Sequence, residues 1–249
     1  MNKIVLITGV AGGIGYATAQ HFKQNGWVVV GVDRQDTSSL PDIDCRIQVD
    51  IAEPQAIQKV VLQLRQEFDN LHCLVNNAAV QICKPSLEMT VAEWDEIMAV
   101  NVRSCFFLAQ ATYPLLKPVA GSVVNVSSVH AVATSANIAA YATSKGALLA
   151  MTRALAIEFA SANIRVNAIL PGAVDTSMLR SGLQRGHLSG DYVDELLTDL
   201  GKKTVIGRVG NPREIAEAIW FLANNTCSSF MTGQSLIVDG GATARLSTE

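Results

Sequence analysis

The chain has 249 residues, of which 49% are hydrophobic and 16% are charged, and its formal net charge is −3. A chain of this length can bury one large core, and a single α/β domain of this size is ordinary. The small net charge gives no electrostatic footprint for nucleic acid or for an anionic membrane, so we expect neither as a partner.

The five cysteines are odd in number and widely spaced, and no two form a C-x-x-C pair. This spacing argues against a disulfide framework or a zinc site, so we expect no bound metal. The opening sequence "MNKIVLITG" enters an apolar strand at once, unlike a signal peptide, and the longest apolar stretches have only strand length. We therefore expect a cytoplasmic protein with buried free thiols.

Apolar runs rich in Val, Ile and Leu alternate with helical patterns along the whole chain. Such continuous runs are typical of parallel strands that are covered on both faces. Seven strands are predicted, at Lys3–Thr8, Trp27–Asp33, Cys45–Asp50, His72–Ala78, Ser122–Ser128, Arg165–Gly172 and Ser235–Gly241. This alternation predicts one α/β domain over residues 1–249, a doubly wound seven-stranded parallel sheet with helices on both faces.

Two of the intervening helices have recognisable beginnings. Thr90 followed by Glu93 predicts a capping box, in which each side chain bonds the backbone of the other residue. Asn211, Pro212 and Glu214 predict a second helix start, as the cap, the first-turn proline and the box partner.

The segment from Asp175 to Gly210 contains no predicted strand. It is long for a connection in a compact α/β unit, which indicates a functional lid. An apolar stripe within it predicts a short helix that ends at Gly201. The stripe consists of Tyr192, Val193, Leu196, Leu197 and Leu200.

The first strand ends in the glycine-rich sequence "TGVAGGIG" (Thr8–Gly15), and a helical pattern follows it. Gly9, Gly12, Gly13 and Gly15 permit a tight turn and let the backbone approach a pyrophosphate at the helix N-terminus. A P-loop would end in Gly-Lys-Ser/Thr, and no lysine is present. The turn therefore predicts a dinucleotide site in a fold of the Rossmann type.

Asp33 closes the second strand, about twenty residues after the turn. A carboxylate at this place accepts hydrogen bonds from the adenosine ribose and repels a 2′-phosphate, so the predicted cofactor is NAD. Arg34 follows directly and could tolerate such a phosphate, so NADP stays possible. The alternative interpretation of Asp33 is a residue that initiates a turn.

Tyr141 and Lys145 lie four positions apart in "AAYATSKGALLAM", on one face of a predicted helix. In the simpler interpretation the lysine is solvated and packs its stem on the ring. In the other, the ammonium group lowers the pKa of the phenol so that it can transfer a proton.

Taken together, these motifs resemble those of the short-chain dehydrogenase/reductase family along essentially the whole chain. They follow the family's order and spacing: "TGVAGGIG", "NNAA" (Asn76–Ala79), Asn101 in "AVNVRS", Ser128, "YATSK", "PGAVDT" (Pro171–Thr176) and "TGQSLIVDGG". Ala79 departs from the family, which more often has glycine there. The resemblance implies an NAD(P)-dependent oxidoreductase that interconverts a secondary alcohol and a ketone.

The resemblance also implies roles for four catalytic residues. Tyr141 would be the general acid/base, and Lys145 would bind the nicotinamide ribose and lower the Tyr141 pKa. Ser128 would bond the substrate oxygen, and Asn101 would hold a water in a proton relay. The strand pattern gives Ser127 the opposite face from Ser128.

The same resemblance implies a set of cofactor-binding residues. The set includes the four glycines of the turn, Asp33, Arg34, Tyr141 and Lys145. Ile14 would lie at the pyrophosphate, Asp50 and Ile51 at the adenine, and Asn77 and Ala78 at the adenosine ribose. Val174 and Thr176 would lie at the nicotinamide amide, with Pro171 and Gly172 beside them.

Gln81 and His130 are predicted to face the cleft with Ser128 and Tyr141 as substrate residues. "SSVHA" resembles bacterial glucose dehydrogenases, and Gln81 with His130 resembles 3-hydroxybutyrate dehydrogenases. The latter usually have a lysine where this chain has Ile138. The best prediction is a sugar, polyol or 3-hydroxy-acid substrate. His130 has an equally weighted alternative as an ordinary loop histidine.

Two other functions stay open. A 3-oxoacyl-carrier-protein reductase would use basic residues to meet an acidic carrier, and Arg180 resembles one of them. A non-catalytic protein that senses NAD(H) would not need all four catalytic groups. The resemblance also implies a homotetramer or homodimer, and the apolar sequence "CFFLAQA" (Cys105–Ala111) is compatible with it.

Overall fold

The computed structural model describes residues 2–183 and 192–244. In this part of the chain seven strands form one sheet in the order β3-β2-β1-β4-β5-β6-β7, and every neighbouring pair is parallel. The strands are β1 (Ile4–Thr8), β2 (Val28–Asp33), β3 (Cys45–Gln48), β4 (Cys73–Asn76), β5 (Ser122–Val126), β6 (Arg165–Pro171) and β7 (Ser235–Val238). The predicted fold class and all seven strands are confirmed.

Most of the predicted strands run one to three residues too far at their carboxyl ends. Asp50, Asn77 and Ser128 leave the ladder and enter the loops that follow it. Their apolar neighbours continue the strand pattern, but their polar side chains bond to backbone outside the strands instead. The overshoot therefore falls on the edge of the sheet where polar residues gather.

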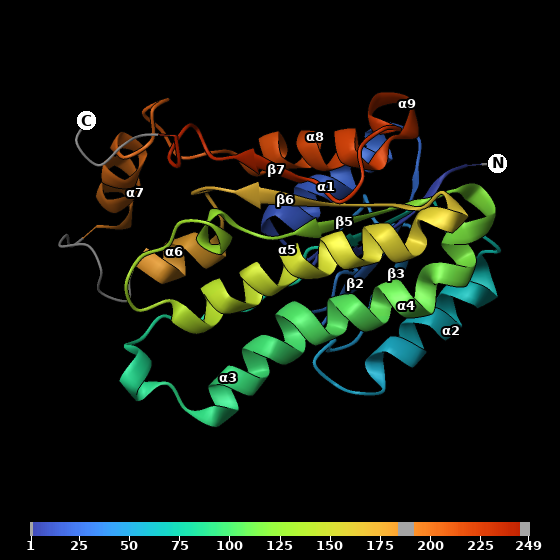
Figure 1. Ribbon diagram of the computed structural model, residues 1–249, viewed down its shortest axis with the longest axis horizontal. Helices are drawn as coiled ribbons and strands as arrows, with labels where there is room; N and C mark the ends of the chain where they lie inside the picture. The colour runs from blue at the N-terminus through green and yellow to red at the C-terminus, as the bar shows by residue number, and fades with distance from the viewer. Residues whose placement is uncertain (1, 184–191, 245–249) are drawn as a thin grey trace.

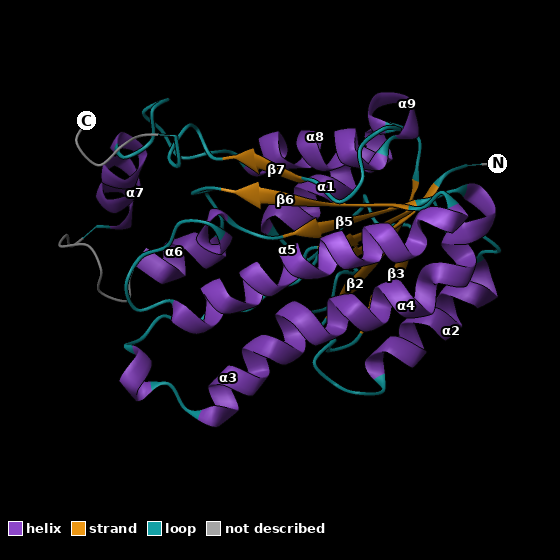
Figure 2. Cartoon of the chain, viewed as in Figure 1, coloured by secondary structure: helices purple, strands orange, loops and turns teal. Residues whose placement is uncertain are grey.

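Helices cover both faces of the sheet (Figures 1 and 2). One face carries α2 (Ala56–Glu67), α4 (Ser104–Leu116) and α5 (Ala139–Phe159), and the other carries α1 (Gly13–Gln24) and α8 (Pro212–Ala223). Helix α3 (Val91–Met98) runs into α4 through a π-helical turn, and the short α9 (Asn225–Ser228) follows α8.

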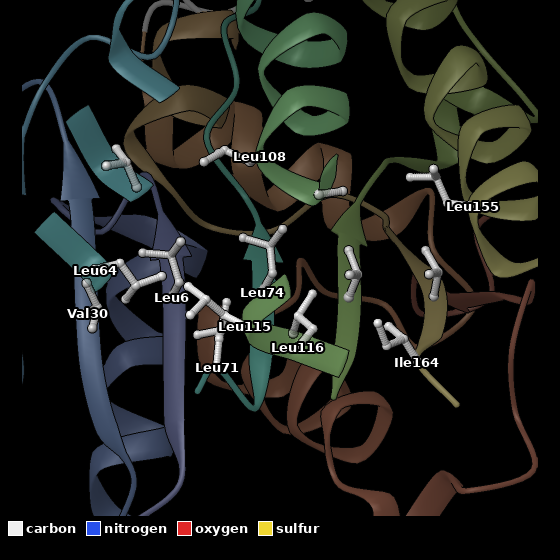
Figure 3. Packing of buried hydrophobic residues seen from close by; sticks show 14 of the residues in the cluster. Leu6, Val30, Leu64, Leu71, Leu74, Leu108, Leu115, Leu116, Leu155 and Ile164 are labelled. Atoms are coloured by element: carbon white, nitrogen blue, oxygen red, sulfur yellow. The ribbon is translucent and has the colours of Figure 1, made fainter. Parts of the chain in front are cut away.

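Two apolar cores hold these layers together. In the first, strand residues such as Leu6, Val30 and Leu74 pack against Leu64 of α2 and Leu108 of α4 (Figure 3). The second lies on the other face, between the sheet and helices α1 and α8. Burial of a side chain of this kind stabilises the fold by about 1.5–3 kcal/mol. The rigid sheet fixes the loops at its carboxyl edge.

Both predicted capping boxes are confirmed. Thr90 Oγ1 accepts from the backbone N–H of Glu93 at 3.3 Å, and the Glu93 carboxylate accepts from the N–H of Thr90 at 2.9 Å. Asn211 and Glu214 form the equivalent box at the start of α8, with Pro212 in its first turn.

The predicted lid segment holds α6 (Ser177–Leu183) and α7 (Val193–Lys202), which lie beyond the carboxyl ends of the strands (Figure 1). The helix predicted from the apolar stripe is confirmed as α7, which ends at Lys202, one residue beyond the expected Gly201. Part of the predicted lid, residues 184–191, lies outside the described residues. A parallel bridge between Val174 and Gly210 joins the two ends of the segment.

All five cysteines are free. Cys73 and Cys105 are buried, and Cys45 and Cys83 are half-buried. The expectation of buried thiols is wrong for Cys227, which is exposed in the short helix α9. Among the described residues, the helices are too short or too polar to cross a membrane.

Candidate active site

A cavity of about 780 Å³ lies at the carboxyl edge of the sheet. It extends from the β1–α1 turn past the ends of β4 and β5 to the lid segment. Nearly all predicted site residues line it: Gly9, Gly12, Gly13, Ile14, Asp33, Arg34, Asp50, Ile51, Asn77, Ala78, Gln81, Ser128, His130, Tyr141, Lys145, Pro171, Gly172, Val174 and Thr176. Gly15 and Asn101 lie outside the lining that the described residues form.

Two glycines of the glycine-rich turn have different surroundings: Gly12 faces open space, and Gly15 packs closely against the backbone of Gly9. A Cβ atom on Gly12 would meet no described atom within 4 Å, so its backbone is open to the cavity. A Cβ atom on Gly15 would lie 1.9 Å from the carbonyl oxygen of Gly9. Gly15 thus lets α1 pack on the turn, which corrects the expectation that it lines the cofactor site.

The turn fits the pyrophosphate of a dinucleotide. Gly9 and Gly13 have φ values of +73° and +54°, which favour glycine. Gly12 is the N-cap residue of α1, and no described side chain caps that N-terminus. The first backbone N–H groups of a helix attract anions, and here they adjoin the open space beside Gly12.

Asp33 lies where a ribose-binding carboxylate is predicted. It lines the cavity, and its Oδ2 accepts from the N–H of Ala11 at 2.9 Å, within the glycine-rich turn. Oδ1 accepts from the N–H of Gln35 at 2.9 Å, so the turn interpretation also holds. Arg34 and Asp50 line the same end of the cavity.

Tyr141 and Lys145 are both buried on α5, and the Lys145 Nζ lies 5.4 Å from the centre of the Tyr141 ring. Lys145 Nζ donates to the carbonyl oxygen of Val126 at 2.8 Å. The solvated-lysine interpretation is therefore wrong.

The pKa values of the two groups correct one expectation. Burial raises the pKa of Tyr141 to about 12, which the hydrogen bond with Ser128 offsets only in part. Burial lowers the pKa of Lys145 to about 8. The expected fall in the Tyr141 pKa is not found: desolvation outweighs the hydrogen bond with Ser128, and Lys145 is not among the groups that shift this pKa.

The two adjacent serines differ as the strand pattern predicts. Ser128 Oγ accepts from the N–H of His130 at 3.2 Å and is also hydrogen-bonded with Tyr141. Ser127 Oγ donates to the carbonyl oxygen of Lys145 at 2.8 Å. Ser128 therefore contacts the phenol, whereas Ser127 fixes the helix that carries it.

His130 lies beside the phenol. Its ring centre is 6.0 Å from that of Tyr141, in an edge-on arrangement, and its Nδ1 is 3.0 Å from Thr134 Oγ1. Burial lowers the His130 pKa, so the imidazole is neutral at pH 7. Across the lining, Gln81 Nε2 donates to Cys83 Sγ at 3.1 Å.

Asn101 lies behind the cavity in the π-helical turn, Ala99–Arg103, and is fully buried. Its Oδ1 accepts from the N–H of Val80 at 2.8 Å, and its Nδ2 donates to the Val80 carbonyl at 2.9 Å and to Ser144 Oγ at 3.0 Å. The side-chain amide connects the loop after β4 to helix α5, and its part in a proton relay stays a prediction.

The sequence analysis did not predict every residue of the lining, on the lid side or elsewhere. The lining residues that it missed include Cys83, Ser135, Met178, Leu179, Gly182, Leu183, Leu200, Lys203, Thr204 and Ala242. The apolar stripe of α7 predicts a helix but not which residues face the cavity. Among residues 2–183 and 192–244, no cluster of His, Cys, Asp or Glu could hold a metal ion.

A sequence model of a protein family, described as enoyl-(acyl carrier protein) reductase, matches residues 9–243. The chain belongs to the short-chain dehydrogenase/reductase family. It is an oxidoreductase that acts on CH–OH groups. The family assignment agrees with the sheet order and with the residues that line the cavity.

Two relatives and one solved structure are similar over almost their full length. An NAD-dependent glycerol dehydrogenase of Listeria innocua is 31% identical, covering 98% of this chain and 95% of that protein. A 3-oxoacyl-[acyl-carrier-protein] reductase of Thermotoga maritima is 33% identical, and the match covers 96% of this chain and 97% of that protein. The ligand-free aldohexose dehydrogenase of Thermoplasma acidophilum superimposes with a TM-score of 0.93 at 30% identity. The match covers 99% of this chain and 96% of that chain.

Proposed function

We propose that the chain is an NAD-dependent dehydrogenase that interconverts a secondary alcohol and a ketone, with Tyr141 as the general acid/base. The observation that carries this proposal is the meeting of the Tyr141 phenol, the Ser128 hydroxyl and the Lys145 ammonium group in one cavity. These groups can hold a substrate oxygen and exchange its proton.

Two side chains of the protein have separate roles: Ser128 binds the substrate oxygen, and Tyr141 transfers its proton. A nicotinamide bound in the cavity would exchange a hydride with the substrate carbon. Ser128 donates a hydrogen bond to the substrate oxygen and stabilises the charge that develops there. In oxidation, the Tyr141 phenolate takes the hydroxyl proton of the alcohol; in reduction, the phenol returns it. The buried Lys145 favours the phenolate when it carries its proton.

The preference for NAD is supported by Asp33. A 2′-phosphate beside this carboxylate would bring two negative charges together. Arg34 in the same lining would offset part of that repulsion, so NADP is the weaker cofactor rather than an excluded one. The name of the Listeria relative also includes NAD dependence.

The substrate class is supported by two polar side chains in the cavity lining. Gln81 and His130 line the cavity beside Ser128 and Tyr141. A neutral imidazole and an amide can bond a second oxygen of a sugar, a polyol or a 3-hydroxy acid. The names of the glycerol and aldohexose dehydrogenases fit the polyol or sugar part of this class.

A 3-oxoacyl-carrier-protein reductase is the second candidate, supported by the Thermotoga relative. Arg180, the predicted carrier contact, is held in ion pairs with Asp175 at 2.7 Å and Asp194 at 3.1 Å. A carrier would have to break these pairs, which makes this function the weaker proposal. A non-catalytic NAD(H) sensor is weaker still, because the complete set of proton-transfer groups is assembled.

We also propose a cytoplasmic homotetramer or homodimer, with a small-molecule alcohol or ketone as the partner of each copy. Phe106 and Phe107 of α4 and Ile157 of α5 expose large apolar surfaces on one side of the fold. Burying these side chains between copies would remove them from water.

The test compares Tyr141→Phe with Tyr113→Phe, a control that loses the same hydroxyl outside the cavity, where Tyr113 packs on Phe159. We expect Tyr141→Phe to lower kcat for an accepted alcohol by at least about a thousandfold, within the range of general acid/base catalysis. NADH binding, measured by fluorescence, should stay within about twofold of the unmodified protein. Wild-type turnover by Tyr141→Phe would refute the proposed mechanism.

A further inference from the structure

The lid side of the cavity carries one residue that no part of the proposed mechanism uses. Lys203 follows α7 directly and lines the cavity, as do Leu200 in the last turn of that helix and Thr204 beside it. The backbone N–H of Lys203 donates to the carbonyl oxygen of Leu200 at 3.1 Å, which fixes the direction of the chain at this point. Leu179 and Leu183 of α6 line the same side.

The charges of the cavity are unevenly distributed. Five charged side chains line it among the described residues: Asp33, Arg34, Asp50, Lys145 and Lys203. Asp33 ends β2, Arg34 follows it and Asp50 follows β3, at the end proposed for the adenosine. Lys145 donates to the carbonyl oxygen of Val126. On the lid side, Lys203 is the charged residue, and its neighbours in the lining are largely apolar.

The other described cations of this segment are committed to carboxylates. Arg180 pairs with Asp175 and Asp194, and Arg208 pairs with Glu214 at 2.6 Å. Lys202 donates to Asp199 at 2.7 Å and is the main cause of the lowered pKa of that carboxyl, to which Lys203 contributes less.

Lys203, by contrast, forms no ion pair with a described residue. Because Lys203 is exposed where it lines the cavity, its flexible ammonium group can reach an anion inside without first losing a described partner.

We propose that Lys203 is a specificity-determining residue that binds an anionic oxygen group of the substrate, a carboxylate remote from the carbon that is oxidised. This inference rests on the proposed function and narrows its substrate class to hydroxy acids and the corresponding oxo acids. Ser128 and Tyr141 hold the reacting oxygen on the α5 side, and Lys203 holds the carboxylate from the lid side. An uncharged polyol lacks the group that Lys203 recognises.

The experiment uses pairs of 3-hydroxy acids and their methyl esters, which differ in the charge of the remote group, together with polyols. Each is assayed with the unmodified protein, with Lys203→Met and with Lys202→Met, a control that removes the neighbouring lysine, whose partner is Asp199. We expect Lys203→Met to raise KM for the acids about tenfold or more, the scale of one charge contact, with kcat within about twofold. The esters and the Lys202→Met control should change less than about twofold.

Two further measurements separate this contact from others. Lys203→Arg should recover most of the affinity for the acids, because it retains the charge. NADH binding, followed by fluorescence without substrate, should be the same for Lys203→Met and the unmodified protein. A loss of NADH binding in that variant would assign Lys203 to the pyrophosphate of the cofactor and overturn the inference.

The outcomes also distinguish this inference from the proposed function. Equal effects of Lys203→Met on acids and esters, or oxidation of polyols in preference to hydroxy acids, would overturn the inference and leave the dehydrogenase intact. NADH binding without turnover of any compound in either class would count against the proposed function itself.

Discussion

The ammonium nitrogen of Lys145 lies 5.4 Å from the centre of the Tyr141 ring, and both side chains are buried. Burial opposes charge on each, so it raises the pKa of the phenol to about 12 and lowers that of the amine to about 8. A buried cation without a carboxylate partner is costly to the fold. Lys145 therefore lowers the stability of the fold while it carries its charge.

This cost predicts that Lys145→Met stabilises the protein measured without ligands. The folded pKa of Lys145 lies below its ordinary value of 10.5, so the cost of charging it is fully present below about pH 8 and disappears above about pH 10.5. A shift of this size corresponds to roughly 3 kcal/mol. The variant also loses a hydrogen bond to Val126, worth about 1 kcal/mol.

We accordingly expect Lys145→Met to be more stable by about 2 kcal/mol at pH 7, with the difference shrinking between pH 8 and pH 10.5. Urea unfolding at several pH values measures it. Comparing the two proteins at each pH cancels the titration of all other groups. A stability difference that is constant with pH, or of the opposite sign at pH 7, would contradict the prediction.

The second prediction concerns the choice of dinucleotide. Asp33→Ala removes the carboxylate that lines the cavity, so the ratio of kcat/KM for NAD⁺ to that for NADP⁺ should fall. We expect a ratio of at least about ten in the unmodified protein, the scale of a contact of roughly 1.4 kcal/mol, and a ratio near one in the variant. Asp36→Ala is the control, because Asp36 is exposed and bonds only the neighbouring Ser38 among the described residues. Equal efficiency with both cofactors before substitution would refute the assignment.

The third prediction separates two glycines of the same turn. Gly12→Ala should fold normally, because its Cβ meets no described atom within 4 Å and its φ of −178° suits any residue. Its methyl group would enter the open space, so we expect NADH affinity to fall about tenfold or more. Gly15→Ala should instead lose about 2 kcal/mol or more of stability, because its Cβ would lie 1.9 Å from the Gly9 oxygen. Thermal unfolding measures the stability of both variants, and NADH fluorescence measures their affinity for the cofactor. A destabilised Gly12→Ala, or a Gly15→Ala of unchanged stability, would contradict the prediction.

Local signals in the sequence predict the parts of this fold that depend on neighbouring residues. The capping boxes of Thr90 and Asn211 need only residues three positions apart, and the strands follow from unbroken apolar runs. The edge at which polar residues meet then follows from the parallel topology, whereas the strand order does not, because doubly wound parallel sheets occur in more than one order.

Tertiary contacts determine what the sequence could not predict. Asn101 is identifiable as a site residue, yet its bonds to Val80 and Ser144 depend on how α5 packs against the loop after β4. The Tyr141 pKa depends on the depth of the cavity, which no spacing reveals. Lys203 was missed because its place in the lining depends on the packing of α7 over α6.

The last prediction concerns His130, which has two interpretations: substrate contact or ordinary loop residue. The structure places its ring in the cavity lining, 6.0 Å from the Tyr141 ring, and tethers Nδ1 to Thr134. A site that bonds a second substrate oxygen discriminates against compounds lacking it, because the protein groups are then left unpaired. His130→Ala should therefore lower kcat/KM for the best substrate at least about tenfold, and that for a simple secondary alcohol no more than about twofold.

Two variants sharpen this test. His130→Gln keeps a hydrogen-bonding side chain and should recover part of the discrimination. Thr134→Val removes the tether at Nδ1 without emptying the lining, so its effect should be intermediate and fall on the same substrate. Because Ser128 also bonds the backbone N–H of His130, an alanine at this position retains the local turn, and a change in substrate discrimination cannot be attributed to its collapse. Equal losses for both substrates, or none for either, would leave His130 as a loop residue and remove the second-oxygen contact from the proposed substrate class.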